Sequence, residues 1–183
     1  WPGNARIALN FVFNVEEGSE QSVGDGDAMH EVHLTEVTAS PVRQGQRDRG
    51  AESMFEYGSR VGYWRLFRMF TDRALPVTIF GCAVALERNP QIAESIRDAK
   101  WDVCAHGYRW TEHHQLDEAE ERQQIAKAVE SIERTTGTRP TGWYCRYAPS
   151  DHTRRLLVEE GGFAYDSDAY NDERRKLIGN DAS

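Results

Sequence analysis

Residues 77–107 read VTIFGCAVALERNPQIAESIRDAKWDVCAHG and contain the parts of a strand–helix–strand unit. Val77 to Gly81 is a short apolar run, and Trp101 to Gly107 is a second run of the same kind. Between them, Pro90 to Ala99 places two isoleucines four residues apart, a spacing typical of one face of a helix. We therefore predict two strands joined by a helix.

The same alternation extends toward the N-terminus. Ala5 to Asn14 alternates apolar and other residues, which predicts a strand with four large side chains on one face: Ile7, Leu9, Phe11 and Phe13. Large apolar residues recur at helical spacing over Tyr57 to Ala74, which predicts a helix. Val15 to Gly50, which lies between them, has no sustained period and is rich in Gly, Ser, Asp and Glu. We predict a long functional or mobile loop there.

The alternation also continues toward the C-terminus. Asp117 followed by Glu120 is a capping-box pattern, and it predicts the start of a helix that ends near Gly137. The remaining predicted elements are a strand at 142–146, a helix at 153–160 closed by two glycines, and a strand at 163–166. Five strands that alternate with four helices predict an α/β fold with a parallel sheet, either a barrel or a doubly wound sheet.

Composition excludes several classes of function. The 183 residues suffice for one domain, and 39% hydrophobic with 28% charged residues is typical of an ordered globular protein. The formal net charge is −8 and no dense basic stretch occurs, so we expect no nucleic-acid partner. The longest apolar runs are about ten residues, about half of what a membrane-spanning helix needs, so we expect no membrane partner. Three widely spaced cysteines and no visible secretion signal lead us to expect a cytoplasmic protein.

Most of the chemically useful side chains follow the carboxyl ends of the predicted strands, which meet at one edge in such folds. Adjacent carboxylates suit hydrolysis, since one can take a proton from water while the other positions it, holds a cation or binds substrate. Glu16 and Glu17 are the leading candidates, and the alternative is that they are two solvated loop acids. His106 would serve as a metal ligand or as a proton-transfer and substrate-orienting group.

Other side chains near the predicted strand ends have simpler alternatives. Arg146 would clamp a carboxylate or orient an acid, or it would form a surface salt bridge. The aromatic residues near it would wall a small pocket or simply pack. We expect His113 and His114 to be surface loop residues, and the cysteines near the predicted site to be buried small hydrophobic residues.

These motifs resemble the NodB homology domain of the polysaccharide deacetylase superfamily, which includes the family 4 carbohydrate esterases. Asn14-Val15-Glu16-Glu17-Gly18 stands where that family usually has Thr-Phe-Asp-Asp-Gly. In the family the first Asp is the catalytic base, and the second binds a divalent metal together with the two histidines of a His-x-x-x-His motif. Here Trp110 stands four residues after His106. The resemblance therefore implies a catalytic site without a metal, the alternative being a divalent metal such as zinc.

The same departures characterise a branch of allantoinase-like cyclic-amide hydrolases. The stretches similar to that branch are Trp1-Pro2-Gly3, Glu16-Glu17-Gly18, Gly45-Gln46-Arg47, Glu52-Ser53, Glu56-Tyr57-Gly58-Ser59-Arg60, His106-Gly107-Tyr108-Arg109-Trp110 and Tyr165-Asp166-Ser167-Asp168-Ala169-Tyr170-Asn171-Asp172. The resemblance implies a partial, distorted (β/α) barrel over residues 1–172 that lacks its C-terminal strands. Residues 173–183 would be a divergent or truncated tail.

The resemblance also implies a function and the residues that perform it. We expect a hydrolase of non-peptide carbon–nitrogen bonds that opens a small cyclic ureide or imide, with Glu16, Glu17 and His106 as catalytic residues. The expected substrate-binding residues are Glu52, Ser53, Trp110, Arg146 and Asp166. The alternatives are a polysaccharide N-deacetylase and an inactive, shortened barrel that persists as an oligomer. Because a shortened barrel exposes sheet edges, we expect a homo-oligomer.

Overall fold

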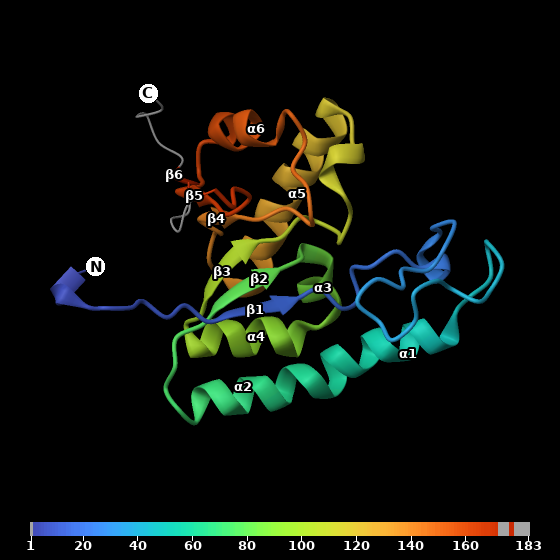
Figure 1. The fold of residues 1–183 in the computed structure, drawn as a ribbon, viewed down its shortest axis with the longest axis horizontal. Helices are drawn as coiled ribbons and strands as arrows, with labels where there is room; N and C mark the ends of the chain where they lie inside the picture. Colours follow the sequence, from blue (N-terminus) through green and yellow to red (C-terminus); the bar gives the residue numbers. More distant parts are fainter. Residues whose placement is uncertain (1, 172–175, 178–183) are drawn as a thin grey trace.

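A six-stranded sheet forms the centre of the molecule (Figure 1). The structure is a computed structural model, and it describes residues 2–171 and 176–177. The strands are β1 (Val12–Val15), β2 (Thr78–Gly81), β3 (Asp102–Ala105), β4 (Gly142–Trp143), β5 (Tyr165–Asp166) and β6 (Lys176–Leu177). They lie side by side in sequence order; β1 to β5 are parallel and β6 is antiparallel to β5. The predicted α/β fold with a parallel sheet is confirmed.

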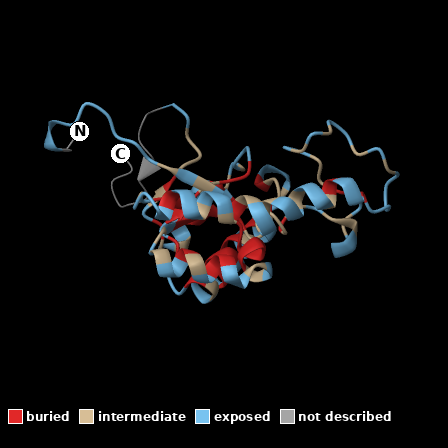
Figure 2. Cartoon of the chain, turned by 90° about the horizontal axis from the view of Figure 1, so that it is seen from below, coloured by how far each residue is buried: buried red, intermediate tan, exposed pale blue. Residues whose placement is uncertain are grey.

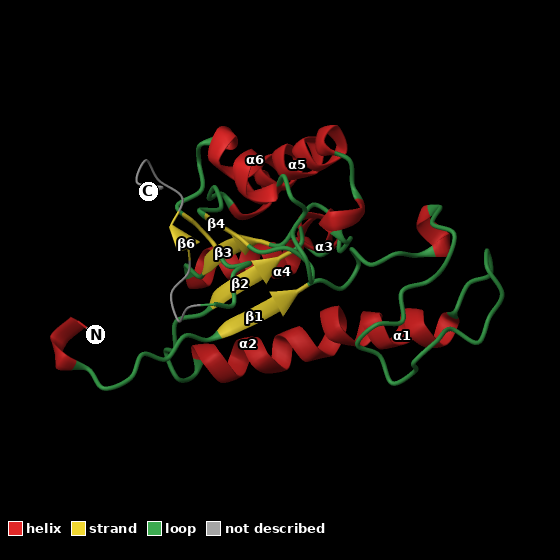
Figure 3. Ribbon diagram, turned by 45° about the horizontal axis from the view of Figure 1, so that its top comes forward, coloured by secondary structure: helices red, strands yellow, loops and turns green. Residues whose placement is uncertain are grey.

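Helices connect the parallel strands (Figure 3). The α-helices are α1 (Arg49–Tyr57), α2 (Tyr63–Thr71), α3 (Ala83–Arg88), α4 (Pro90–Ala99), α5 (Glu118–Thr136) and α6 (Thr153–Glu160). A π-helical turn, η3 (Gly58–Gly62), joins α1 to α2, and short 3₁₀ turns occur at η1 (Pro2–Asn4), η2 (Val23–Asp25) and η4 (His113–Gln115). Within the described residues, no helix combines the length and apolar character needed to cross a lipid bilayer.

The hydrophobic core lies between the sheet and the helices (Figure 2). Every residue of β2 is buried, as expected for a strand that has a neighbour on each side. The apolar side of α4 contributes Ile92 and Ile96, whose exposed fractions are 2% and 0%. Burial of an aliphatic side chain of this size stabilises the fold by about 1.5–3 kcal/mol. The helical period read from the sequence therefore identifies the buried side of α4 correctly.

The first strand is much shorter than predicted. Only Val12–Val15 is paired in β1, whereas Ile7 and Leu9 are 69% and 74% exposed on an extended arm. Phe11 and Phe13 do pack against the core, where they contact aromatic rings of α2. Alternation alone predicted one strand over 5–14, but a strand requires a hydrogen-bonded neighbour, and β2 begins only at Thr78 opposite Val12.

The other elements lie close to their predicted positions, with three differences. The helical segment before β2 begins at Arg49 and is interrupted by η3, and helix α3 was not predicted. Strands β3 to β5 are shorter at their ends than predicted. The capping box is confirmed: Asp117 accepts the backbone N–H of Glu120, and the Glu120 side chain accepts that of Asp117. The predicted tail contributes β6, and the rest of it lies outside the described residues, as do Trp1 and Asp172 of the quoted motifs.

A buried polar network ties α5 to two loops of the sheet. Glu121 has no exposed surface, and its Oε1 lies 3.1 Å from Nδ1 of buried His113. The hydroxyl groups of Ser150 and Thr153 donate to the same carboxylate. Burial alone would raise the pKa of Glu121, but hydrogen bonds from His113, Ser150 and Thr153 lower it below its usual value. The segment after β3 and the segment after β4 are thus fixed to one carboxylate.

We predict that Glu121→Gln destabilises the fold in a pH-dependent way. A carboxylate with a lowered folded-state pKa stabilises the fold above its unfolded-state pKa of about 4.3, and this stabilisation is lost as the pH falls through the folded-state value. Urea unfolding should show a loss of about 1.5–3 kcal/mol at pH 7 that shrinks as the pH falls from 5 to 3. Glu130→Gln, an exposed control in the same helix, should leave the free energy of unfolding nearly unchanged at each pH. A loss that does not vary with pH would contradict the assignment.

Candidate functional site

Glu16 and His106 form the centre of the candidate site. Glu16 directly follows β1 and His106 directly follows β3, so the parallel sheet brings them to the same edge. The Nε2 atom of His106 lies 2.8 Å from Oε1 of Glu16, and the amide of Asn14 donates to the same oxygen at 2.8 Å. His106 is only 3% exposed. The predicted proximity of these two residues is therefore present in the structure.

The surroundings of His106 define where its protons lie. Its Nδ1 is 2.7 Å from the backbone oxygen of Tyr144, so this nitrogen carries a proton and donates it. Its Nε2 faces Oε1 of Glu16, so the imidazole ring is held between the Tyr144 backbone and the Glu16 carboxylate. Because Asn14 and His106 both engage Oε1, Oε2 of Glu16 is the oxygen left to accept a proton from water.

A small cavity lies beside this pair. Its volume is about 150 Å³, which is roughly the space of five water molecules in the liquid. Glu16, Glu17 and Thr35 provide its polar groups, and the rest of its wall is apolar: Leu34, Met54, Phe55 and Trp110. A mainly apolar wall with a few oxygen acceptors suits a small ligand that carries N–H donors.

Glu17 occupies a different environment from Glu16. Its carboxyl group lies against the backbone of η3 and accepts the backbone N–H of Glu16 at 3.3 Å. Burial raises the pKa of Glu17 above its ordinary value, and the nearby acids Glu16 and Glu20 raise it further. The two adjacent glutamates are thus held in unlike surroundings, although both line the cavity.

Arg146 joins three loops around the cavity. Its guanidinium lies 3.8 Å from the ring centre of Trp110, after β3, and donates to the Trp110 backbone oxygen at 2.8 Å. It also pairs with Glu31 of the long loop after β1, at 2.5 Å. Arg146 is 6% exposed, so this is a buried pair and not the surface salt bridge considered as an alternative. Arg146 therefore supports the cavity wall by holding Trp110 in place.

Three residues predicted to bind substrate are engaged elsewhere. Both carboxylate oxygens of Glu52 accept hydrogen bonds from Arg47, and Ser53 is exposed and donates to the backbone of its own helix. The Arg47 contact lowers the pKa of Glu52. Asp166 is buried and paired with Arg154. None of Glu52, Ser53 and Asp166 lines the cavity beside Glu16, whereas Trp110 does.

Two further expectations have clear outcomes. His113 was predicted to be a surface residue, which is wrong because its pairing with Glu121 buries it to 1% exposure, while the side chain of His114 is 43% exposed. The side chains of Cys82 and Cys104 are fully buried, as expected. The sequence did not lead us to predict Asn14 and Glu31 as residues of the site, although Asn14 stands two residues before Glu16 in the quoted motif. Glu31 lies in a loop without periodicity, so no pattern in the sequence indicated it.

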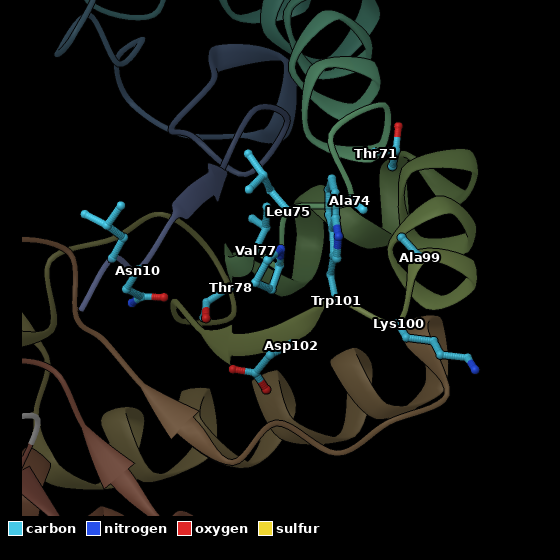
Figure 4. A pocket seen from close by; sticks show the side chains of 12 residues that line it. Asn10, Thr71, Ala74, Leu75, Val77, Thr78, Ala99, Lys100, Trp101 and Asp102 are labelled. Carbon is cyan, nitrogen blue, oxygen red and sulfur yellow. The ribbon is translucent and has the colours of Figure 1, made fainter. Parts of the chain in front are cut away.

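A larger cavity of about 500 Å³ lies at the opposite edge of the sheet (Figure 4). It is formed where β2 and β3 begin, between Thr78, Trp101 and Asp102 and the end of α2. It contains none of the predicted site residues. In folds of this architecture the amino-terminal edge of the sheet supports stability, and the chemistry lies at the carboxyl edge.

The donor set does not fit the metal site implied by the family. Zinc is held by nitrogen, oxygen or sulfur ligands, and the Trp110 side chain that replaces the second histidine offers none. The two nitrogens of His106 already face Tyr144 and Glu16. Within residues 2–171 and 176–177, three His, Cys, Asp or Glu side chains nowhere come together in a way that would hold a metal.

Two solved structures have a fold closely similar to that of this chain. The crystal structure of PuuE allantoinase is 46% identical, with a TM-score of 0.88. A polysaccharide deacetylase homologue from Pseudomonas aeruginosa PAO1 is 47% identical, also with a TM-score of 0.88. Each match covers 94% of this chain and 57% of the other chain. The sheet and its helices therefore correspond to part of a NodB-type (β/α) barrel, as predicted.

Sequence comparison identifies the family independently. The polysaccharide deacetylase family model matches residues 43–165. A polysaccharide deacetylase homologue from Schizosaccharomyces pombe is 35% identical over 181 residues, which is 94% of this chain and 56% of the relative. The chain thus spans between half and three fifths of the length of these relatives. By both its sequence and its fold, the chain belongs to the polysaccharide deacetylase family.

Proposed function

We propose that this chain is the part of a hydrolase that opens a small cyclic amide, such as a ureide or imide, by attack of water on a ring carbonyl. The observation that carries the proposal is Glu16 on the wall of a cavity of about 150 Å³, with its carboxylate held from behind by His106. The similarity to PuuE allantoinase supports the same reading of the substrate.

The chemistry of the site suits this substrate class. A cyclic ureide carries several N–H donors, and Glu16, Glu17 and Thr35 offer acceptors within one small space. The Glu16 carboxylate disfavours an anionic ligand. The small volume favours a single ring over a polymer, and the apolar wall favours a planar one.

The activation of water follows from the positions of Glu16 and His106. Oε2 of Glu16 takes a proton from a water molecule while the oxygen of that water attacks the carbonyl carbon. His106 holds the carboxylate in place through Oε1, and Tyr144 in turn holds the imidazole ring through Nδ1. Trp110 and Arg146 keep the wall in position, which fixes the ring relative to the attacking water.

We predict that the chain opens allantoin or a simple cyclic imide, measured by NMR as loss of the ring substrate. Glu16→Gln keeps the shape of the side chain but removes the proton acceptor, so kcat should fall on the order of a hundredfold or more. Glu130→Gln, at an exposed position of α5, is the matched control and should leave kcat unchanged. Absence of turnover on every cyclic amide tested would overturn the proposal for this chain.

We also predict that turnover does not depend on a divalent metal, because Trp110 cannot serve as a ligand and both nitrogens of His106 are engaged. Dialysis against a chelator should leave kcat/KM within about twofold of the untreated protein, with unchanged circular dichroism as the control for folding. Loss of activity that added zinc restores would contradict this prediction.

A second candidate is removal of acetyl groups from an amino-sugar polymer. It is favoured by curated relatives such as the peptidoglycan deacetylase of Helicobacter pylori, 30% identical over 110 residues. Acetate release from N-acetylglucosamine oligomers in the presence of zinc, without any opening of cyclic amides, would replace the first proposal with this one.

A further inference from the structure

The π-helical turn η3 carries a glycine that its backbone does not require. Gly58 has φ −57° and ψ −56°, ordinary right-handed helical values that alanine adopts more readily than glycine. Gly62, at the other end of the same turn, also has helical values, φ −58° and ψ −51°. The reason for glycine at position 58 therefore lies outside the conformation of the backbone.

The reason is the close approach of the Glu17 side chain. A Cβ atom on Gly58 would lie 2.2 Å from Oε1 and 2.7 Å from Cγ of Glu17, distances far inside van der Waals contact. A Cβ atom on Gly62 would meet nothing closer than 3.7 Å, from the backbone oxygen of Tyr57. The two glycines thus share one backbone conformation, and only Gly58 makes room for a carboxyl group of the cavity.

In the slot beside Gly58, burial and the nearby acids disfavour a negative charge on Glu17, and they outweigh the backbone N–H groups of Glu16 and Glu17 that favour it. The charged groups around Glu17 are the acids Glu16 and Glu20. Arg88 donates to the backbone oxygen of Gly18, but its guanidinium is paired with Asp25. In the described residues Glu17 forms no ion pair, and the raised pKa of Glu17 agrees with this setting. Glu16 has a different environment, because His106 and Asn14 donate hydrogen bonds to its carboxylate. Two neighbouring carboxyl groups in unlike surroundings are suited to opposite roles in proton transfer.

We infer that Gly58 is a positioning residue whose bare backbone forms a slot for the Glu17 side chain, and that Glu17 is the acid that protonates the departing nitrogen. The inference deepens the proposed function and rests on it. The water oxygen bonds to the ring carbonyl carbon as Glu16 takes a proton from that water. The carbon–nitrogen bond then breaks with its electron pair going to nitrogen, and that nitrogen takes the proton of Glu17. Transfer of the proton from Glu16 to Glu17 restores the starting state.

Thermal unfolding of Gly58→Ala and Gly62→Ala, each in the native background and with Glu17→Ala, tests the slot without any substrate. Gly62→Ala should raise Tm by about 2–4 °C in both backgrounds, because alanine favours a helix. Gly58→Ala should raise Tm by this amount only in the Glu17→Ala background, because Glu17→Ala removes the atoms that the new methyl group would meet. An equal gain from Gly58→Ala in both backgrounds would overturn the slot.

Titration of the Glu17 carboxyl carbon by NMR, assigned from its absence in Glu17→Ala, tests the setting of the acid. In the native chain and in Gly62→Ala the midpoint should lie above the ordinary value of about 4.3, and in Gly58→Ala it should fall toward that value. A midpoint that Gly58→Ala leaves unchanged would overturn the positioning role of Gly58.

Turnover then separates the acid role from the proposed function. With a cyclic amide that the chain opens, Gly58→Ala should lower kcat at least tenfold with little change in KM, and Gly62→Ala should not. Native kcat and pH profile in Gly58→Ala would overturn the acid role of Glu17. If no cyclic amide is opened, the proposed function fails, while the unfolding and titration results still decide whether the slot exists.

Discussion

In a parallel sheet every strand ends at the same edge, and the site of this protein depends on that geometric constraint. The registers of β1 with β2 and of β2 with β3 place Val15, Gly81 and Ala105 side by side. The next residues after β1 and β3 are Glu16 and His106, which meet at 2.8 Å although they are far apart in the chain. A shift in the register of β1 would move Glu16 away from His106 and would also turn its side chain toward the other face.

The loops that surround this pair are fixed by charged and polar contacts more than by apolar packing. Arg146 joins Trp110 to Glu31, Arg88 and Arg109 pair with Asp25 and Asp27 of the long loop, and Glu121 joins the segments after β3 and β4. Buried guanidinium and carboxylate groups are costly unless they are paired and hydrogen-bonded. The Arg146–Glu31 and His113–Glu121 contacts are buried, so they hold the surrounding loops in the positions in which these groups meet, whereas Arg88 is half exposed.

Periodicity and capping signals predicted most of the fold because they report local physics. The Pro90–Ala99 and Thr153–Glu160 helices have their predicted bounds, and the capping box at Asp117 starts α5 as expected. The first strand was overestimated because Ile7 and Leu9 alternate correctly but have no neighbouring strand to pair with. Whether a segment pairs with a distant strand depends on the tertiary structure, so it cannot be predicted from a local stretch of sequence.

The candidate site was predictable to a similar degree and for the same reason. Glu16, Glu17, His106 and Trp110 follow strands, so the fold itself brings them together. Glu52, Ser53 and Asp166 were proposed through a resemblance, and local partners engage them instead. Burial of His113 depends on Glu121 of a different element, and neither residue type is usually buried. The oligomer, the cytoplasmic location and the division at residue 172 stay predictions.

The long segment between β1 and α1 is anchored at a few charged points and contains only one short 3₁₀ turn. Leu34 and Thr35, which close one side of the cavity, follow those anchors in the segment. Because their neighbours in the segment contribute little to the hydrophobic core, substitutions there alter the shape of the cavity at small cost to folding. The barrel and the choice of ligand can therefore evolve almost separately, with one set of residues under selection for packing and another free to follow a new substrate.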